Sequence, residues 1–118
     1  MFNADYSSIK LIDLGVSSKL DKTKATVAAQ GGTPRYMPPE QLDGNLTFKV
    51  DIWSFGCVLL EFGCGIRPYN QIDNDVALSM TIFRGLNPLD YAMESENADK
   101  FNIVTENPDF KSILEACF

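Results

Sequence analysis

One apolar segment constrains the fold of this chain more than any other part of its sequence. Residues 51–65, DIWSFGCVLLEFGCG, predict a helix that ends in glycines, with Pro68 beyond it. Apolar side chains lie nearly all the way round this helix, a pattern typical of helices enclosed by other protein. The whole chain has 118 residues. We therefore expect it to cover this helix incompletely and to expose an apolar face that favours aggregation.

Little regular structure is predicted before this helix. Residues 8–12 (SIKLI) predict a strand, with a hairpin turn at residues 5–7. Residues 13–39 show no sustained period and contain glycine and proline at positions that break regular structure. Such a long irregular stretch is unusual in a compact domain and is often functional. Residues 38–42 (PPEQL) then suit the first turn of a short helix.

Two further helices are predicted after Pro68. The first covers residues 75–84. The apolar residues along one of its faces are Val76, Met80 and Phe83. Residues 85–108 are polar, acidic and weakly periodic, so we expect mostly loop there. Residues 109–118 (DFKSILEACF) have apolar residues at helical spacing and stop without a C-cap signal, which suggests a truncated domain. The predicted fold class is mainly α with a short β-hairpin.

The distribution of charge argues against a nucleic-acid partner. The formal net charge is −6. Residues 1–72 hold seven Lys or Arg and seven Asp or Glu, whereas residues 73–118 hold three and nine. Binding to a phosphate backbone needs clustered Lys and Arg, which this balance does not supply.

No membrane partner is expected either. The longest apolar stretch, residues 52–66, is interrupted by Glu61 and is shorter than the roughly 20 residues that span a bilayer. The first ten residues, MFNADYSSIK, do not have the basic and apolar regions of a signal peptide. We therefore expect a cytoplasmic protein.

The cysteines and the lack of histidine narrow the chemistry of this chain. Cys57, Cys64 and Cys117 lie in apolar surroundings and form no C-x-x-C pair. We expect buried, reduced thiols rather than a zinc site or a disulfide framework. The sequence contains no histidine. This excludes a Ser-His-Asp triad and the usual histidine acid–base chemistry.

Asp13 allows two interpretations from its local sequence. In LIDLGVSS, residues 11–18, an apolar run ends on this aspartate and the chain turns at Gly15. The carboxylate could cap a backbone bend, as aspartates often do. It could instead bind a metal ion at the lip of a cleft, because carboxylate oxygens are preferred ligands of Mg²⁺. The short segment alone favours the cap.

Three motifs, taken in order, resemble those of the eukaryotic protein kinases of the Ser/Thr type. They are IDLG at residues 12–15, GTPRYMPPE at 32–40 and DIWSFGCVLLE at 51–61. The corresponding kinase patterns are D-F-G, G-T-x-x-Y/W-M-A-P-E and D-x-W-S-x-G-x-x-x-x-E. The resemblance covers about residues 6–118. It implies part of the C-terminal lobe of the kinase fold, whose parent domain is α+β.

The resemblance also implies a division of the chain. Residues 1–118 would be a truncated kinase domain with its activation segment at about 13–40. The helix at about 51–65 would be helix F of the family, and the helix at about 75–84 would be helix G. Residues from about 109 to 118 would begin helix H.

By the same resemblance, Asp13 is a magnesium ligand beneath ATP. Phosphoryl transfer needs a divalent metal to neutralise the charge on the phosphates. Leu14 stands where the family usually has Phe and still places an apolar side chain beside the aspartate. Gly15 permits the backbone to reorient there. Together with the two later motifs, this favours the metal ligand over the bend cap.

Three threonines are candidate functional residues. Thr33 in GTPRYM resembles the threonine that helps to position the substrate hydroxyl in Ser/Thr kinases, and a turn-capping hydroxyl is its alternative role. Thr26, and after it Thr23, are candidate phosphorylation sites because they lie among lysines that would pair with an added phosphate. An unmodified, solvated loop is the alternative for both.

Four residues of the later motifs have structural roles in the resemblance. Glu40 resembles a glutamate that forms a buried ion pair with an arginine, which would lie beyond Phe118. Asp51 can act as the N-cap of its own helix, and in the family it also holds the catalytic loop. Trp53, like Phe55 and Phe62, is expected in the core, and Gly56 is the glycine of the same motif.

The implied activity is that of a protein serine/threonine kinase, which transfers a phosphoryl group from Mg²⁺-bound ATP to Ser or Thr of protein substrates. This chain has no G-x-G-x-x-G loop and, without histidine, no H-R-D-x-x-x-x-N loop. In kinases these loops hold ATP and supply the catalytic base. A working kinase also needs a strand lysine paired with a helix glutamate, and this pair is not present in the chain either. We therefore expect the chain alone to be inactive. The alternative is a catalytically inactive, kinase-like binding or regulatory module.

Overall fold

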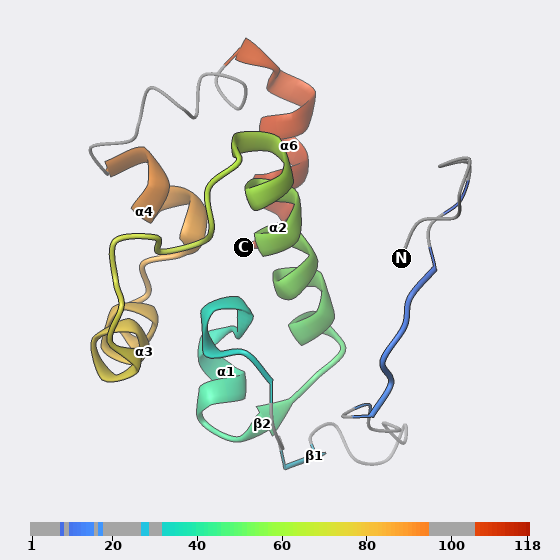
Figure 1. The fold of residues 1–118 in the computed structure, drawn as a ribbon, viewed down its shortest axis with the longest axis vertical. Helices are drawn as coiled ribbons and strands as arrows, with labels where there is room; N and C mark the ends of the chain where they lie inside the picture. The colour runs from blue at the N-terminus through green and yellow to red at the C-terminus, as the bar shows by residue number, and fades with distance from the viewer. Residues whose placement is uncertain (1–7, 9, 16, 18–26, 29–31, 95–105) are drawn as a thin grey trace.

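The computed structural model describes residues 8, 10–15, 17, 27–28, 32–94 and 106–118, and these are mainly helical (Figure 1). Helix α2 lies at the centre, where α6 packs along it and α4 also contacts it, while α3 contacts η1 and α1. The elements in chain order are β1 (Val27–Ala28), the 3-10 helix η1 (Pro34–Tyr36), α1 (Pro39–Leu42), β2 (Asn45–Leu46), α2 (Lys49–Cys64), α3 (Asp75–Phe83), α4 (Pro88–Glu94) and α6 (Pro108–Cys117).

The prediction of a strand at residues 8–12 is wrong for the residues that the structure describes. Residues 8 and 10–15 form no strand and are exposed, Leu11 by 92%. A strand needs a neighbour to pair its N–H and C=O groups, and this segment runs apart from the helices in Figure 1. The predicted hairpin turn at residues 5–7 lies outside the described residues.

Two short strands, β1 and β2, form within the described part of the chain. They pair antiparallel, with Val27 opposite Leu46 and Ala28 opposite Asn45. This ladder joins the segment before η1 to the segment before α2. The small sheet therefore lies at a different place from the hairpin expected near the N-terminus.

Helix α2 begins two residues before the predicted start. Phe48 occupies the N-cap position, and Thr47 Oγ1 accepts a hydrogen bond of 3.2 Å from the backbone N–H of Lys49. The prediction that Asp51 is the N-cap is therefore wrong, because Asp51 lies inside the first turn of the helix. Its negative charge there still interacts favourably with the helix dipole. The helix ends as predicted, at Gly65 in the left-handed conformation (φ 67°).

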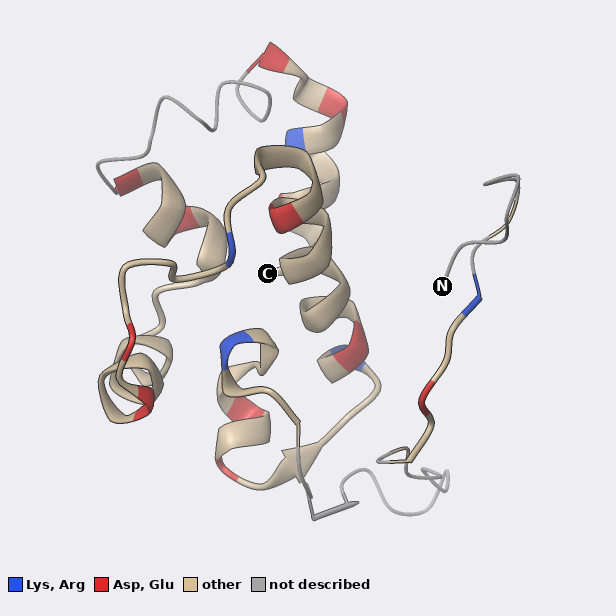
Figure 2. Ribbon diagram, in the orientation of Figure 1, with Lys and Arg blue, Asp and Glu red and all other residues tan. Residues whose placement is uncertain are grey.

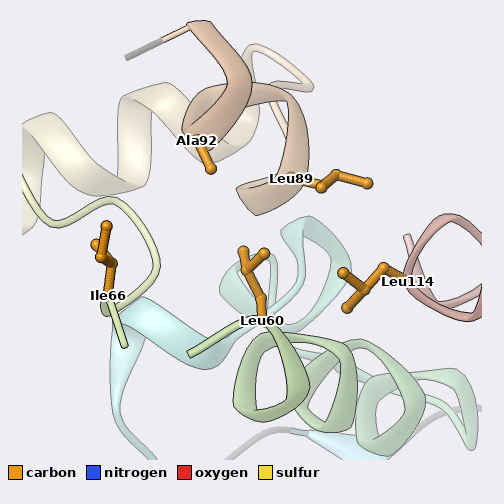
Figure 3. Close-up of a cluster of buried hydrophobic side chains, with 5 residues drawn as sticks. All are labelled: Leu60, Ile66, Leu89, Ala92 and Leu114. Carbon is orange, nitrogen blue, oxygen red and sulfur yellow. The ribbon is translucent and has the colours of Figure 1, made fainter. Parts of the chain in front are cut away.

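The main core cluster joins α2 to the C-terminal helices. Figure 3 shows Leu60 projecting from α2 toward α4, with a leucine of α6 beside it. The buried members of this cluster are Leu60, Ile66, Leu89, Ala92 and Leu114. Burial of a leucine or isoleucine side chain stabilises a fold by about 1.5–3 kcal/mol. This cluster therefore fixes α4 and α6 against α2.

The prediction of mostly loop over residues 85–108 is wrong for Pro88–Glu94, which form α4. Proline occupies the first helical position, where its missing N–H is not needed. The side chain of Asn87 accepts a hydrogen bond of 2.8 Å from the backbone N–H of Asp90. Leu89 and Ala92 then form the buried side of this short helix.

A second core cluster lies between α3 and the preceding loop. It consists of Tyr69, Leu78 and Ile82, each 1% exposed. Helix α3 confirms the helix predicted at residues 75–84, although the apolar face named from the sequence does not reach the core. The exposed side chains of that face are Val76, Met80 and Phe83.

One face of α2 remains uncovered, as the sequence predicts. Its exposed apolar side chains are Ile52, Phe55, Val58 and Phe62. The expectation that Phe55 and Phe62 lie in the core is therefore wrong, and Trp53 is half-buried. The opposite side packs against α6, the final helix, whose predicted position at residues 109–118 is confirmed. The short helix predicted at residues 38–42 is also confirmed as α1.

Replacing Gly56 with alanine should destabilise the chain. The added Cβ would lie 2.6 Å from Cβ of Cys117 and 3.0 Å from Cζ of Phe118, so α2 and α6 would have to separate. Overpacking of this kind costs about 1–3 kcal/mol. We expect the free energy of unfolding, measured by urea titration, to fall by this amount.

Gly63→Ala is the matched control in the same helix. Its Cβ would meet the ring tip of Phe110 at 2.7 Å, which can rotate away, and alanine favours a helix interior over glycine by about 1 kcal/mol. Equal losses for the two variants would contradict a close approach of the two helix backbones at Gly56.

Replacing Phe55 and Phe62 with lysine should reduce self-association without lowering the free energy of unfolding. These side chains are 54% and 82% exposed, so little burial is lost. Sedimentation velocity measures the association. Val76→Lys, on an exposed face of α3, is the control. An equal reduction in that variant would contradict a special role for the α2 face.

Candidate functional site

Asp13 lies in an extended, exposed segment with its backbone in the left-handed region (φ 62°). Aspartate tolerates this conformation better than most residues, and such outliers often mark functional positions. Cβ built on Gly15 would lie 3.4 Å from Oδ1 of Asp13, so this carboxylate lies over the glycine. Among the described residues the carboxylate makes no hydrogen bond and belongs to no group of three or more metal-ligating side chains. Both interpretations of Asp13 therefore stay predictions, as does the role of Gly15.

Thr33 is exposed and occupies the N-cap position of η1. Its side chain makes no capping hydrogen bond, although its carbonyl accepts one of 3.0 Å from the backbone N–H of Tyr36. The alternative of a turn-capping hydroxyl is thus not realised. Thr26 and Thr23 lie outside the described residues, and their modification stays a prediction.

Two hydrogen bonds of Tyr36 anchor η1 on α2. Its hydroxyl donates to Oε2 of Glu61 over 2.5 Å, and its carbonyl accepts from Oγ of Ser54 over 2.8 Å. Burial, reinforced by the hydrogen bond and the negative charge of Glu61, raises the pKa of Tyr36 to about 12. The second and third sequence motifs are therefore in direct contact.

Arg35, the residue before Tyr36, forms hydrogen bonds with the loop before α3 and not with α2. Its guanidinium donates to the carbonyl oxygens of Pro68 (2.8 Å), Tyr69 (2.5 Å) and Ile72 (2.6 Å). A polar hollow of about 320 Å³ lies beside it. The residues that line it are Arg35, Gly65, Ile66, Arg67, Asn70 and Asp73.

A second hollow, of about 360 Å³, lies between α1, α2 and the end of α6. Glu40, half-buried in the first turn of α1, lines it together with Lys49 and Trp53. Nε1 of Trp53 is buried and has no hydrogen-bond partner among the described residues. The indole ring packs edge-on against Phe118, with 5.1 Å between the ring centroids. Glu40 forms no ion pair within the described part of the chain.

The three cysteines are free. Burial, with a smaller effect from Cys117, raises the pKa of the Cys57 thiol to about 12. Burial also raises the pKa values of Cys64 and Cys117. Thiols held in their protonated form are poor nucleophiles and poor metal ligands. These side chains are therefore packing residues.

Figure 2 shows how the charged residues are distributed along the ribbon over the described ranges. Lys and Arg are dispersed in this view, and acidic segments occur on α3, α4 and α6. No helix among the described residues is long and apolar enough to cross a membrane.

Sequence reasoning identified Thr33 and the motif that contains Ser54 and Glu61, but it did not identify Arg35. The arginine is visible inside GTPRYM, yet its partners are backbone carbonyls, which every sequence supplies. Tyr36 was also missed as an anchor. The sequence feature that could have identified this contact is a tyrosine in the second motif, Tyr36, together with a carboxylate at the end of the third, Glu61.

The family model for the protein kinase domain matches residues 1–118. The chain belongs to the protein kinase family.

Curated relatives include several kinases of one signalling class. Mitogen-activated protein kinase kinase 5 from Leishmania mexicana is 43% identical over 70 residues, which are 58% of this chain and 13% of the relative. Dual specificity mitogen-activated protein kinase kinase mek-1 from Caenorhabditis elegans is 29% identical over 113 residues, or 92% of this chain and 28% of the relative. Mitogen-activated protein kinase kinase SIPKK from Nicotiana tabacum is 33% identical over 111 residues, or 92% and 29%. The chain therefore spans less than a third of each relative.

Replacing Tyr36 with phenylalanine should lower stability at pH 8 and weaken its dependence on alkaline pH. The lost hydrogen bond is worth about 1 kcal/mol. Because the pKa of Tyr36 rises from 10.0 to about 12, the unfolded chain ionises first, and the free energy of unfolding falls between pH 10 and 12. Urea titrations across this range measure the slope.

Burial also raises the pKa values of Cys57 and Tyr69, so these two groups keep part of the slope in the variant. Glu61→Gln is the comparison, because it keeps a hydrogen-bond acceptor and removes the negative charge. An unchanged slope in Tyr36→Phe would contradict the raised pKa of this tyrosine.

Proposed function

We propose that this chain is the C-terminal-lobe part of a protein serine/threonine kinase. The observation that supports this most directly is the attachment of η1 to α2. Tyr36 of GTPRYMPPE bonds to Ser54 and Glu61 of DIWSFGCVLLE, although 18 and 25 residues separate them. In an unrelated helical domain, nothing would require these two segments to be in contact.

In this proposal the kinase elements follow the family order. Residues 13–40 are the activation segment, which η1 and α1 conclude. Helices α2, α3 and α6 are helices F, G and the start of helix H. Their bounds, Lys49–Cys64, Asp75–Phe83 and Pro108–Cys117, support that assignment.

The proposed site residues are Asp13, Thr33 and the threonines of the loop between them. Asp13 binds Mg²⁺ beneath ATP, and its exposed carboxylate and left-handed backbone are compatible with this role. Thr33 positions the acceptor hydroxyl, a role supported by its exposed side chain, which does not cap η1. Thr26 and Thr23 are phosphorylation candidates.

ATP and proteins that bear Ser or Thr are the proposed partners of the whole protein, and the cytoplasm is its proposed location. Free thiols at Cys57, Cys64 and Cys117 support a reducing compartment. The names of the relatives further suggest a kinase that acts on other kinases.

A catalytically inactive, kinase-like binding module is the second candidate. It is compatible with the carboxylate of Asp13, which belongs to no group of three or more metal-ligating side chains among the described residues. Thermal unfolding of the 118-residue chain with and without Mg-ATP should show no shift, because a ligand stabilises only a fold that binds it. A clear upward shift would contradict our expectation that the chain alone is inactive.

A chimera tests the parent activity directly. Residues 13–118 replace the aligned segment of the tobacco relative, which supplies the glycine-rich loop and the catalytic loop. We expect transfer of phosphate from ATP to a protein substrate, measured with labelled ATP. Asp13→Asn should lower kcat by at least about 100-fold, because a metal ligand is lost.

Asp43→Asn is the matched control, since Asp43 is exposed at the end of α1. It should keep the activity of the unaltered chimera. A correctly folded chimera without activity would overturn the kinase proposal and favour the binding module. Equal activities of the Asp13 and Asp43 variants would overturn the assignment of the metal ligand.

A further inference from the structure

Arg35 makes the densest set of side-chain hydrogen bonds in the described part of the chain. One guanidinium nitrogen donates to the carbonyls of Pro68 and Tyr69, and the other terminal nitrogen donates to the carbonyl of Ile72. All three acceptors belong to one turn, which the backbone N–H of Ile72 closes onto the carbonyl of Tyr69 at 3.0 Å. The side chain of Arg35 therefore binds several carbonyls of the same turn at once.

The turn that receives Arg35 is itself rigidly held. Tyr69 is 1% exposed, and its hydroxyl donates to the carbonyl of Leu86 over 2.8 Å. Its ring contacts Tyr91, with 5.2 Å between the ring centroids. The backbone of Tyr69 is left-handed (φ 51°), an unfavourable conformation for a large side chain that surrounding contacts must maintain. Arg35 is therefore bonded to carbonyls that cannot easily move.

An arginine is required for this arrangement. Its planar guanidinium presents five N–H donors in a fixed geometry, whereas a lysine ammonium is a compact charge on a flexible stem. Lysine can reach one or two of the acceptors, but it cannot match the spacing of all three. The acceptors are neutral, so the contact depends on donor geometry and not on an opposite charge.

Neighbouring residues of η1 are thus fixed in two directions. Tyr36 holds η1 to α2, and Arg35 holds it to the turn before α3. Thr33 lies two residues before Arg35, and its carbonyl is bonded to the N–H of Tyr36. The exposed hydroxyl of Thr33 therefore takes its position from these two anchors.

We propose that Arg35 is a positioning residue, which holds Thr33 where the acceptor hydroxyl of the protein substrate binds. This inference rests on the proposed kinase function. It concerns the transfer of phosphate to a substrate hydroxyl and not the binding of ATP. Water, as a small acceptor, needs no such positioning.

The test compares two acceptors in the chimera described above. Arg35→Met should lower kcat/KM for the protein substrate about tenfold and leave ATP hydrolysis and KM for ATP within about twofold. Arg67→Met is the matched control, because Arg67 lines the same hollow and is exposed. It should change neither reaction. Arg35→Lys should give an intermediate loss.

A double-variant cycle tests whether Arg35 acts through Thr33. In a Thr33→Ala background, Arg35→Met should cost little further activity, because coupled residues are not additive. Additive losses would overturn the proposal. So would parallel losses in both reactions together with a lowered Tm, which would mark a purely structural role.

The experiments distinguish a failure of the proposed kinase function from a failure of the proposed role of Arg35. An inactive unaltered chimera removes the kinase function, and the role of Arg35 toward a substrate is lost with it. An active chimera in which Arg35→Met behaves like Arg67→Met overturns the role of Arg35 and leaves the kinase function in place.

Discussion

Leu60, in the C-terminal half of α2, makes the apolar contact on which the other helices depend. Its buried partners are Ile66, Leu89, Ala92 and Leu114. Removal of apolar surface from water is the main favourable term in folding, so this contact sets the positions of α4 and α6. Helix η1 takes its position from the same helix through the hydrogen bonds of Tyr36. The arrangement of the proposed substrate site therefore follows from the packing of α2.

The sequence predicted the long elements well because their signals are local. The apolar run of α2 and the helical spacing in α6 lie within the elements themselves. Helix α4 was missed because its buried face has few residues, and its burial depends on partners in α2 and α6. The prediction of a strand at residues 8–12 was wrong because apolar composition favours a strand but does not supply a neighbouring strand to pair with it.

The candidate site was predictable as a set of motifs but not as a geometry. Thr33 was identified from its motif, and Tyr36 and Glu61 stand within the quoted motifs, but their mutual contacts were not foreseen. The N-cap is Phe48 and not Asp51, because the helix begins at Lys49 and already contains Asp51 in its first turn. Arg35 could not be recognised, because peptide carbonyls at Pro68, Tyr69 and Ile72 carry no signature in their residue types.

The core is divided into two buried clusters, and this division has a consequence for how the molecule opens. One cluster joins α2, α4 and α6, and the other joins α3 to Tyr69. Tyr91 of α4 packs against the second cluster, so α4 links them. Regions with separate cores can unfold sub-globally as cooperative units. Amide protons of α3 should accordingly exchange with solvent through a partial opening in which the α2–α6 pair stays folded.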